Sequence, residues 1–343
     1  MAGTRRRSRA ATPSWPRRSA RWWTTTSSNT IRARPLRKLS RSDCLRPPCS
    51  PEHRFSMPVT LIAVDLDGTL LDSDGTLSDP NRDALEKAAA RGLQIAVATG
   101  RSFHHTKDLA ARMPDGTVLI LNNGALVKNR TGTTLAHHGL PADTARYLVE
   151  TTREVREGAA AIFDRSDAHQ FVCERVDWTH PHRQRYYLLH RESITETGSL
   201  GDAIAELGLD PLQIGFTGGV RAMRELAASL DSLPRAGEFS HTLTEYPERD
   251  FSLLDVLGPG RSKGRTLAEL AASRGIEADD VMAVGDNLND RTMLEFAGVA
   301  VVMGNASPEL KALGWPETAT NDAGGIAQAI ERFVLGEAGR PAP

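Results

Sequence analysis

Two carboxylates separated by one residue follow a short apolar run near position 60. The run Leu61–Val64 leads directly into Asp65-Leu66-Asp67, and Gly68 then permits a tight turn. Paired carboxylates at the end of a buried strand are costly unless hydrogen bonds or a cation compensate for their charge. Because all the ligands here are oxygens, the site suits Mg²⁺ rather than zinc. The pair therefore predicts a Mg²⁺ site and a carboxylate that can act as a nucleophile.

Three further motifs supply anion-binding groups and more acids. Ala98-Thr99-Gly100-Arg101 offers a hydroxyl and a backbone N–H where another apolar run ends. Ser262-Lys263-Gly264 opens a predicted helix over 263–274, and a lysine beside the positive end of a helix dipole suits a phosphate. Gly285-Asp286-Asn287-Leu288-Asn289-Asp290 follows a third apolar run and adds two carboxylates and an amide donor.

Three of the four motifs end predicted parallel strands, so one edge of a sheet can bring them together. In an open α/β sheet the ligand crevice lies at the carboxyl ends of the strands. The assembled groups are acids for a metal, a nucleophilic carboxylate, and Thr99, Lys263 and Asn289 for an anion. This combination indicates a phosphoryl-transfer site.

The sequence around these motifs alternates between apolar strands and helices. Strands are predicted at 61–65, 93–98, 118–121, 281–285 and 299–303. Helices are predicted at 81–91, 102–112, 263–274, 290–297, 308–313 and 325–334. Apolar strands that alternate with helices favour an α/β fold, with a doubly wound, mainly parallel, Rossmann-like sheet as its core.

The alternation breaks in the middle of the chain, which predicts a second domain inserted into the first. Helices at 142–156 and 200–207 accompany half-buried strand candidates at 160–164, 170–174 and 212–217. We expect two core segments at 57–138 and 248–337, with an α+β cap domain inserted between them at 139–247. A short tail is expected at 338–343.

The four motifs, in this order, resemble those of the haloacid dehalogenase superfamily of phosphatases. The forms that Thr99-Gly100-Arg101, Asn123-Gly124-Ala125, Ser262–Gly264 and Gly285–Asp290 take are similar to the Cof-type subfamily. That subfamily carries a large α/β cap between the second and third motifs. The resemblance covers the chain from Met57 to about residue 336.

The resemblance implies roles for the acidic residues. Asp65 would attack phosphorus and become an aspartyl-phosphate. Asp67 would protonate the leaving oxygen and then activate the water that hydrolyses the intermediate. Mg²⁺ would be held by the carboxylates of Asp65 and Asp286 and by the backbone carbonyl of Asp67.

The resemblance also implies which groups bind the substrate. The expected phosphate ligands are Thr99, Lys263, Asn289 and the N–H groups of Leu66 and Gly100. Asp290 would orient Lys263 or a metal-bound water. Asn123 would lie at the mouth of the site, near the substrate or the cap, although a turn residue before a glycine needs no further role.

These expectations describe a cytoplasmic, Mg²⁺-dependent phosphatase that hydrolyses a small phosphorylated metabolite such as a sugar phosphate. The cap would set its specificity, and the motifs fix neither the natural substrate nor the oligomeric state. Two alternatives remain open. A phosphomutase of the same superfamily would return the phosphoryl group to substrate, whereas a non-catalytic phosphometabolite-binding protein would bind without turnover and would not need Asp67 as a proton donor.

Composition excludes a chain that spans a membrane and a disulfide framework. The 343 residues are 40% hydrophobic and 25% charged, as is ordinary for globular proteins. The aliphatic runs are far shorter than the roughly 20 residues that cross a bilayer as a helix. Three cysteines, Cys44, Cys49 and Cys173, are too few for a disulfide framework or a four-thiolate zinc site.

The first 56 residues differ in kind from the rest of the chain. They hold 14 Arg or Lys and 2 Asp or Glu, whereas the remaining residues hold 28 and 41. With few aliphatic residues and no periodicity, this segment is expected to be disordered. Three interpretations stay open. Translation starts at Met57, the segment is an organelle transit peptide, or it is a basic arm through which nucleic acid would bind.

Several other polar groups are expected to have no catalytic role. Histidines at 104–105, 137–138 and 180–182 lack a second ligand pair at zinc spacing, so we expect surface or cap positions. The run 183–187 is either a basic substrate contact in the cap or a solvated edge. Asp255 precedes the third motif where a glutamate is commoner in the family, and no consequence is attached to it.

Overall fold

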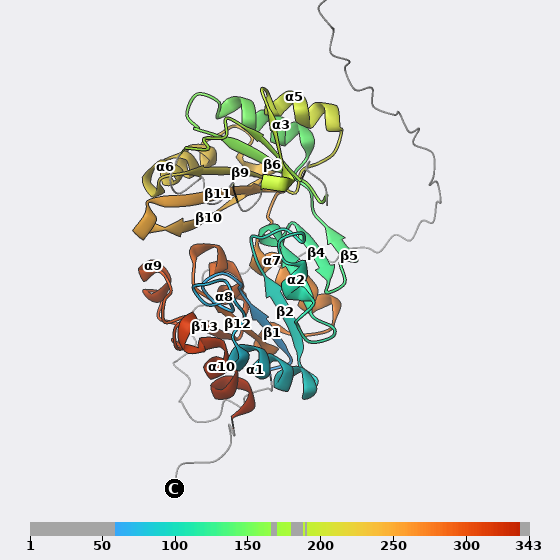
Figure 1. Cartoon of the computed structure of the whole chain (residues 1–343), viewed down its shortest axis with the longest axis vertical. Coiled ribbons are helices and arrows are strands. Elements are labelled where there is room, and N and C mark those ends of the chain that lie inside the picture. The colour runs from blue at the N-terminus through green and yellow to red at the C-terminus, as the bar shows by residue number, and fades with distance from the viewer. Residues whose placement is uncertain (1–58, 166–169, 180–187, 189–190, 337–343) are drawn as a thin grey trace, which may run out of the picture. The chain divides into compact units, whose positions relative to one another are not determined.

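The computed structural model describes residues 59–165, 170–179, 188 and 191–336, which form two β-sheets with helices packed against them (Figure 1). The basic segment 1–56, the start at Met57, the run 183–187 and the tail 338–343 lie outside the described residues. Within the described ranges, no helix is long and apolar enough to cross a membrane.

The first sheet has seven strands in the order β13-β12-β1-β2-β3-β4-β5. Five of them are parallel, and they are β1 (Leu61–Val64), β2 (Gln94–Ala98), β3 (Val118–Leu121), β12 (Val281–Gly285) and β13 (Val299–Val302). An antiparallel hairpin, β4 (Leu126–Asn129) and β5 (Thr134–His137), completes one edge. The prediction of a doubly wound, mainly parallel sheet is confirmed. β1 lies between β12 and β2, and all four of its residues are buried.

Helices flank this sheet in two contacting pairs. α1 (Asp79–Ala90) contacts α10 (Gly325–Ile330), and α7 (Lys263–Ser273) contacts α8 (Arg291–Phe296). Two further helices, α2 (Lys107–Ala110) and α9 (Pro308–Lys311), are single turns. The helix predicted at 102–112 is therefore much shorter than expected. α7 begins at Ser262 because its hydroxyl accepts a hydrogen bond from the N–H of Arg265, which satisfies one free donor of the first turn.

The second sheet has six strands in the order β10-β11-β9-β6-β7-β8. In chain order they are β6 (Ala159–Ile162), β7 (Phe171–Glu174), β8 (Ile194–Thr197), β9 (Gln213–Gly218), β10 (Ser240–Tyr246) and β11 (Phe251–Leu257). Its helices are α3 (Ala142–Thr151), α5 (Leu200–Leu207) and α6 (Val220–Asp231). This sheet extends past the predicted cap boundary at residue 247, because β11 lies in it and ends at Leu257.

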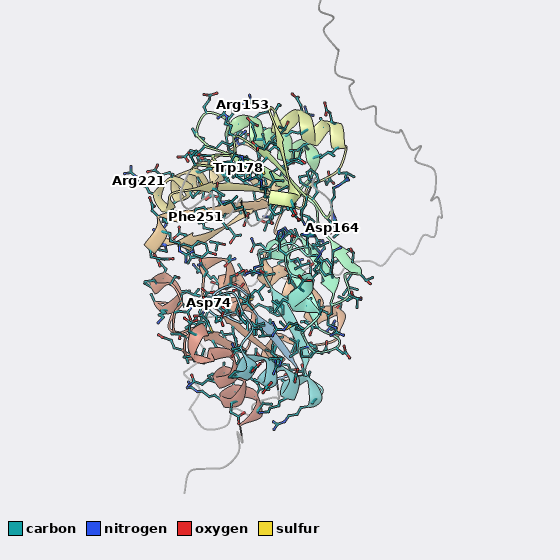
Figure 2. All side chains as sticks on the ribbon, in the orientation of Figure 1. Asp74, Arg153, Asp164, Trp178, Arg221 and Phe251 are labelled. Carbon is teal, nitrogen blue, oxygen red and sulfur yellow. The ribbon has the colours of Figure 1, made fainter. Side chains whose placement is uncertain are left out.

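The helices cover one face of the second sheet. Ile214 and Phe216 of β9 pack with Leu254 and Val256 of β11 in a core that also holds α3, α5 and α6 side chains. Because side chains alternate along a strand, the residues between them face the opposite side. Asp255 therefore lies on the face of β11 opposite these helices, and Phe251 marks this strand in Figure 2.

Candidate active site

A buried ion pair joins the end of β1 to the start of α7. Lys263 Nζ donates to Asp65 Oδ1 at 2.6 Å and to Asp290 Oδ1 at 2.7 Å. Only 1% of Lys263 is exposed, and Asp65 and Asp290 are buried as well. The motif order had predicted that these residues would converge, and the structure places all three in contact.

The charges in this group shift one another's protonation. Burial, followed by the charge of Asp290, raises the pKa of Asp65 to about 7, while Lys263 opposes the rise. Burial alone would lower the pKa of Lys263, but the carboxylates of Asp290 and Asp65 raise it above its usual value. The lysine is therefore charged at neutral pH and favours the ionised form of Asp65.

Asp290 organises the loop that follows β12. Its Oδ2 accepts hydrogen bonds from the N–H groups of Asp286 and Asn287 at 3.0 and 3.1 Å, and its Oδ1 holds Lys263. Gly285 is required beside it, because a Cβ there would lie 2.5 Å from the Asp290 side chain. Both oxygens of Asp290 are thus engaged in holding other parts of the site.

Three carboxylates form a cluster that could hold a metal ion. Oxygens of Asp65, Asp286 and Asp290 lie within 4.8 Å of one another. Burial, and then the charges of Asp65 and Asp290, raises the pKa of Asp286 well above its usual value. Thr69 Oγ1 donates to Asp286 Oδ1 at 2.9 Å. A set of hard oxygens in which burial and neighbouring negative charge raise the pKa of Asp65 and Asp286 fits a divalent cation.

Gly68 lets the first motif approach this cluster. Its φ is +80°, and a Cβ at this position would lie 2.4 Å from Asp286 Oδ2. Any other residue would both strain the backbone and push the carboxylate away. The turn that follows Asp67 therefore depends on glycine for a close approach as well as for its conformation.

The carboxylate of Asp67 lies apart from the cluster. Arg101 Nε donates to its Oδ2 at 2.8 Å, and Arg101 Nη2 contacts its Oδ1. The Asp67 side chain is 43% exposed. The sequence analysis quoted Arg101 within its motif but gave it no role. The contact of Arg101 with Asp67 was therefore not predicted. The available signal was its position directly after Thr99-Gly100.

The other predicted phosphate ligands surround the same strand ends. Thr99 is buried at the end of β2, and its Oγ1 accepts from the N–H of Arg101 at 3.1 Å. Leu66 is buried in the turn after β1. Asn289 Nδ2 donates to Asn123 Oδ1 at 3.2 Å. A Cβ on Gly100 would lie 3.3 Å from Asn123 Nδ2, so this glycine packs against the same amide.

Asn123, which was predicted at the mouth of the site near the substrate or the cap, is buried and contacts the second sheet. Only 1% of it is exposed, and its Nδ2 donates to Asp255 Oδ2 at 2.9 Å. Gln213 Nε2 donates to the other oxygen of Asp255 at 2.8 Å. Burial raises the pKa of Asp255 to about 7, while the hydrogen bond from Asn123 and the charge of Lys263 limit the rise. Sequence reasoning attached no consequence to Asp255, yet it contacts a predicted site residue.

The second sheet contacts the loop Gly285–Asp290, which follows β12, through Asn287. Its Oδ1 accepts from the N–H of Glu245 at 3.2 Å, and its Nδ2 donates to the Glu245 carbonyl at 3.0 Å. The adjacent Tyr246 has its pKa raised by burial and by the nearby charges of Asp67, Asp286 and Asp65. The end of β10 therefore lies beside the acidic residues.

The described histidines and the described cysteine form no comparable centre. In the described part of the chain, the group at Asp65, Asp286 and Asp290 is the only set of three or more His, Cys, Asp or Glu residues that could hold a metal. Cys173 is a buried free thiol, and burial raises its pKa to about 12. Cys44, Cys49 and the histidines at 180 and 182 lie outside the described residues.

Comparison with known proteins gives consistent matches over both sheets. The haloacid dehalogenase-like hydrolase family matches residues 62–330. The putative phosphatase YxeH of Bacillus subtilis is 30% identical, over 80% of this chain and 98% of its own. The pyridoxal phosphate phosphatase YbhA of Escherichia coli is 29% identical, over 81% and 100%. The structure of the phosphatase BT1666 from Bacteroides thetaiotaomicron is 26% identical with a TM-score of 0.67, covering 85% and 99%.

Proposed function

Because the chain belongs to the haloacid dehalogenase-like hydrolase family, we propose that it is a Mg²⁺-dependent phosphatase of small phosphorylated metabolites that works through an aspartyl-phosphate on Asp65. One observation carries the proposal, which is the buried contact of Lys263 with Asp65 beside the carboxylate cluster. A carboxylate and a phosphate ester repel each other, so attack requires cations that offset both charges. Lys263 supplies one cation, and the cluster can hold the other.

The carboxylate cluster fits Mg²⁺ as that second cation. Its donors are hard oxygens, and glycine at position 68 keeps room for Asp286 Oδ2. The proposed ligands are the carboxylates of Asp65 and Asp286 and the backbone carbonyl of Asp67, because both oxygens of Asp290 already accept hydrogen bonds. When bound, the ion offsets negative charge on the phosphate and on the attacking carboxylate.

Asp65 carries the covalent step of the proposed reaction. One of its oxygens bonds to phosphorus as the ester P–O bond breaks, and Asp67 gives its proton to the departing oxygen. Asp67 then takes a proton from water, whose oxygen attacks phosphorus and releases inorganic phosphate and free Asp65. Since Arg101 holds the Asp67 carboxylate here, these two side chains must separate before Asp67 can donate a proton.

Groups around the two strand ends are proposed to bind the phosphate. Thr99 Oγ1 accepts from a backbone N–H and keeps its own proton to donate. Asn289 donates one Nδ2 proton to Asn123 and can donate the second to the phosphate. The full set consists of Thr99, Lys263, Asn289 and the N–H groups of Leu66 and Gly100.

The second sheet and its helices are proposed to be the cap that selects the substrate. The contact of β10 with Asn287 brings Glu245 and Tyr246 next to the loop that carries Asp286. A cap in this place excludes water and determines which leaving groups fit. Sugar phosphates are the first candidates, and the relative named for pyridoxal phosphate adds heteroaromatic phosphates to the panel.

Phosphate release by the full-length chain tests the proposal. Sugar, nucleotide and cofactor monophosphates would be assayed with Mg²⁺ and with a chelator, beside Asp65→Asn, which keeps the shape of the side chain. We expect release that requires Mg²⁺ and disappears in the variant. If folded protein with Mg²⁺ releases no phosphate from any compound, the phosphatase proposal fails and a mutase or a binding protein takes its place.

A further inference from the structure

Four buried side chains form a continuous hydrogen-bonded chain from the phosphate site into the second sheet. Asn289 donates to Asn123 at 3.2 Å, Asn123 donates to Asp255 at 2.9 Å, and Gln213 donates to the other oxygen of Asp255 at 2.8 Å. None of the four is more than 9% exposed. Asn289 is the member that faces the proposed phosphate, so the chain ends at the reacting group.

We propose that Asp255 is a positioning residue for phosphate binding, which acts by fixing the amide of Asn123 and thereby the donor of Asn289. This inference rests on the proposed function, because it assigns Asn289 to the phosphate. It concerns a residue on a cap strand that does not itself touch the substrate.

The direction of the donors along the chain supports this role. An ionised carboxylate can only accept hydrogen bonds, whereas an amide has a donor end and an acceptor end. Asp255 therefore selects the Nδ2 end of Asn123, and the Oδ1 end is left to accept from Asn289. With Asn123 turned over, Nδ2 would face Nδ2, and Asn289 would have to turn its own donor away from the phosphate.

Gln213 gives independent evidence that Asp255 acts as an acceptor on both sides. Its Nε2 faces Asp255, although its buried Oε1 then has no partner among the described residues. An unpaired buried oxygen costs free energy. The orientation is nevertheless required when Asp255 is ionised, because an ionised carboxylate has no proton to offer to Oε1.

Asn123 contacts the segments that carry other proposed phosphate ligands, so a shift in the position of Asn123 would also shift those ligands. Its backbone is left-handed, with φ 53° and ψ 29°, and its N–H donates to the Thr99 carbonyl at 3.0 Å. Its side chain packs on Gly100, and a Cβ on the next residue, Gly124, would lie 2.4 Å from the Ser262 carbonyl at the start of α7. The turn thus lies between the Thr99-Gly100 motif and the helix that begins with Lys263.

Binding of inorganic phosphate tests the inference without requiring turnover. Calorimetry would use the full-length chain with saturating Mg²⁺ at pH 8, where Asp255 is ionised. We expect Asp255→Leu to weaken phosphate binding by about tenfold or more, because the amide of Asn123 loses its acceptor. Asp255→Asn keeps an acceptor of the same shape and should stay within about threefold of wild type.

Two further variants separate positioning from a general loss of structure. Ser252→Ala removes a buried hydrogen bond from the same strand, to the Thr244 carbonyl, and should leave phosphate affinity unchanged. Asn123→Ala should weaken binding as Asp255→Leu does, and the double variant should be no worse than Asn123→Ala alone. Additive losses would indicate that the two residues act separately and would overturn the inference.

The inference and the proposed function can fail separately. If wild-type protein hydrolyses phosphate esters but folded Asp255→Leu binds phosphate as tightly as wild type, Asp255 has no positioning role and the phosphatase stands. If wild type neither binds phosphate nor hydrolyses any phosphate ester, both are wrong. We also expect the Mg²⁺ concentration for half-saturation to be unchanged in Asp255→Leu. The hydrogen-bonded side chains reach the phosphate ligands and not the carboxylate cluster.

Discussion

Lys263 Nζ lies 2.6 Å from Asp65 Oδ1, although 198 positions separate the two residues in the chain. The ammonium is buried with its carboxylates, so removing it would leave Asp65 and Asp290 charged and unpaired. Such a charge is costly in a protein interior. The same contact thus connects the stability of the site with its chemistry.

Lys263→Met is therefore expected to impair both activity and stability. We expect kcat to fall by at least about 100-fold and the free energy of unfolding to fall by about 3 kcal/mol in Mg²⁺-free buffer at pH 8. Steady-state kinetics and chemical denaturation measure the two effects. Lys311→Met is the matched control, because the partly exposed Lys311 pairs with Glu317 and donates to the Gly304 carbonyl, so its loss should cost only about 1 kcal/mol. Equal effects of both substitutions would contradict the assignment.

Asp67→Asn should separate catalysis from folding. Asparagine cannot give or take the proton, so kcat should fall by about 10²–10⁴-fold. The free energy of unfolding should change little, because the Asp67–Arg101 pair is partly exposed to solvent. Mg²⁺ half-saturation should also persist, since only the backbone carbonyl is a proposed ligand. A variant that retains the wild-type kcat would remove Asp67 from the acid–base role.

Two glycines with the same backbone conformation allow a controlled test of the proposed Mg²⁺ site. Gly68 and Gly75 have φ of +80° and +78°, but only a Cβ on Gly68 meets Asp286, whereas one on Gly75 meets nothing within 4 Å. Both alanine variants should lose about 1–2 kcal/mol through backbone strain. Only Gly68→Ala should raise the Mg²⁺ concentration for half-maximal activity, by about tenfold or more. If Gly75→Ala shifts it equally, the effect is strain and not the collision.

Asp255→Asn should change how stability depends on pH. The pKa of this carboxyl is about 7 in the folded protein and 3.8 ordinarily, so the folded state holds the proton more tightly. Raising the pH from about 4 to 7 therefore destabilises wild type, and the loss is complete above about pH 7. The variant has no such proton, so its free energy of unfolding relative to wild type should rise across this window, by up to about 4 kcal/mol. Denaturation at several pH values checks the direction, which a constant difference would contradict.

The central strands could be predicted because their apolar character is local. Val118–Leu121 and Val281–Gly285 are apolar runs next to turn residues, and the structure reproduces both ranges. β10 was not predicted, because Ser240–Tyr246 has Leu243 as its one aliphatic residue and is a strand through its pairing with β11. α6 carried a readable signal that was missed, since its buried Met223, Leu226, Ala227 and Leu230 follow helical spacing.

Within the site, residue type and strand position identified the groups that meet, but not their partners. Asp65, Asp286 and Lys263 each follow or open a predicted element, so their convergence follows from the sheet. The contact of Asn123 with Asp255 joins residues 132 positions apart, from the first sheet and the second. Only the packing of the two sheets brings that pair together. In the sequence, the one signal for it was Asp255 itself, an acid among the leucines and valine of β11.

The position of β1 between β12 and β2 has a consequence for how the chain acquires its structure during synthesis. Leu61 pairs with Gln94 on one side and with Val281 on the other. During synthesis all strands of the second sheet have been made once Leu257 is added, whereas β12, which pairs with one edge of β1, has not yet been made. Domains generally form in order of synthesis, and contacts between distant residues form slowly. The inserted sheet should therefore fold first, and the loop Gly285–Asp290 that follows β12 should take its place last.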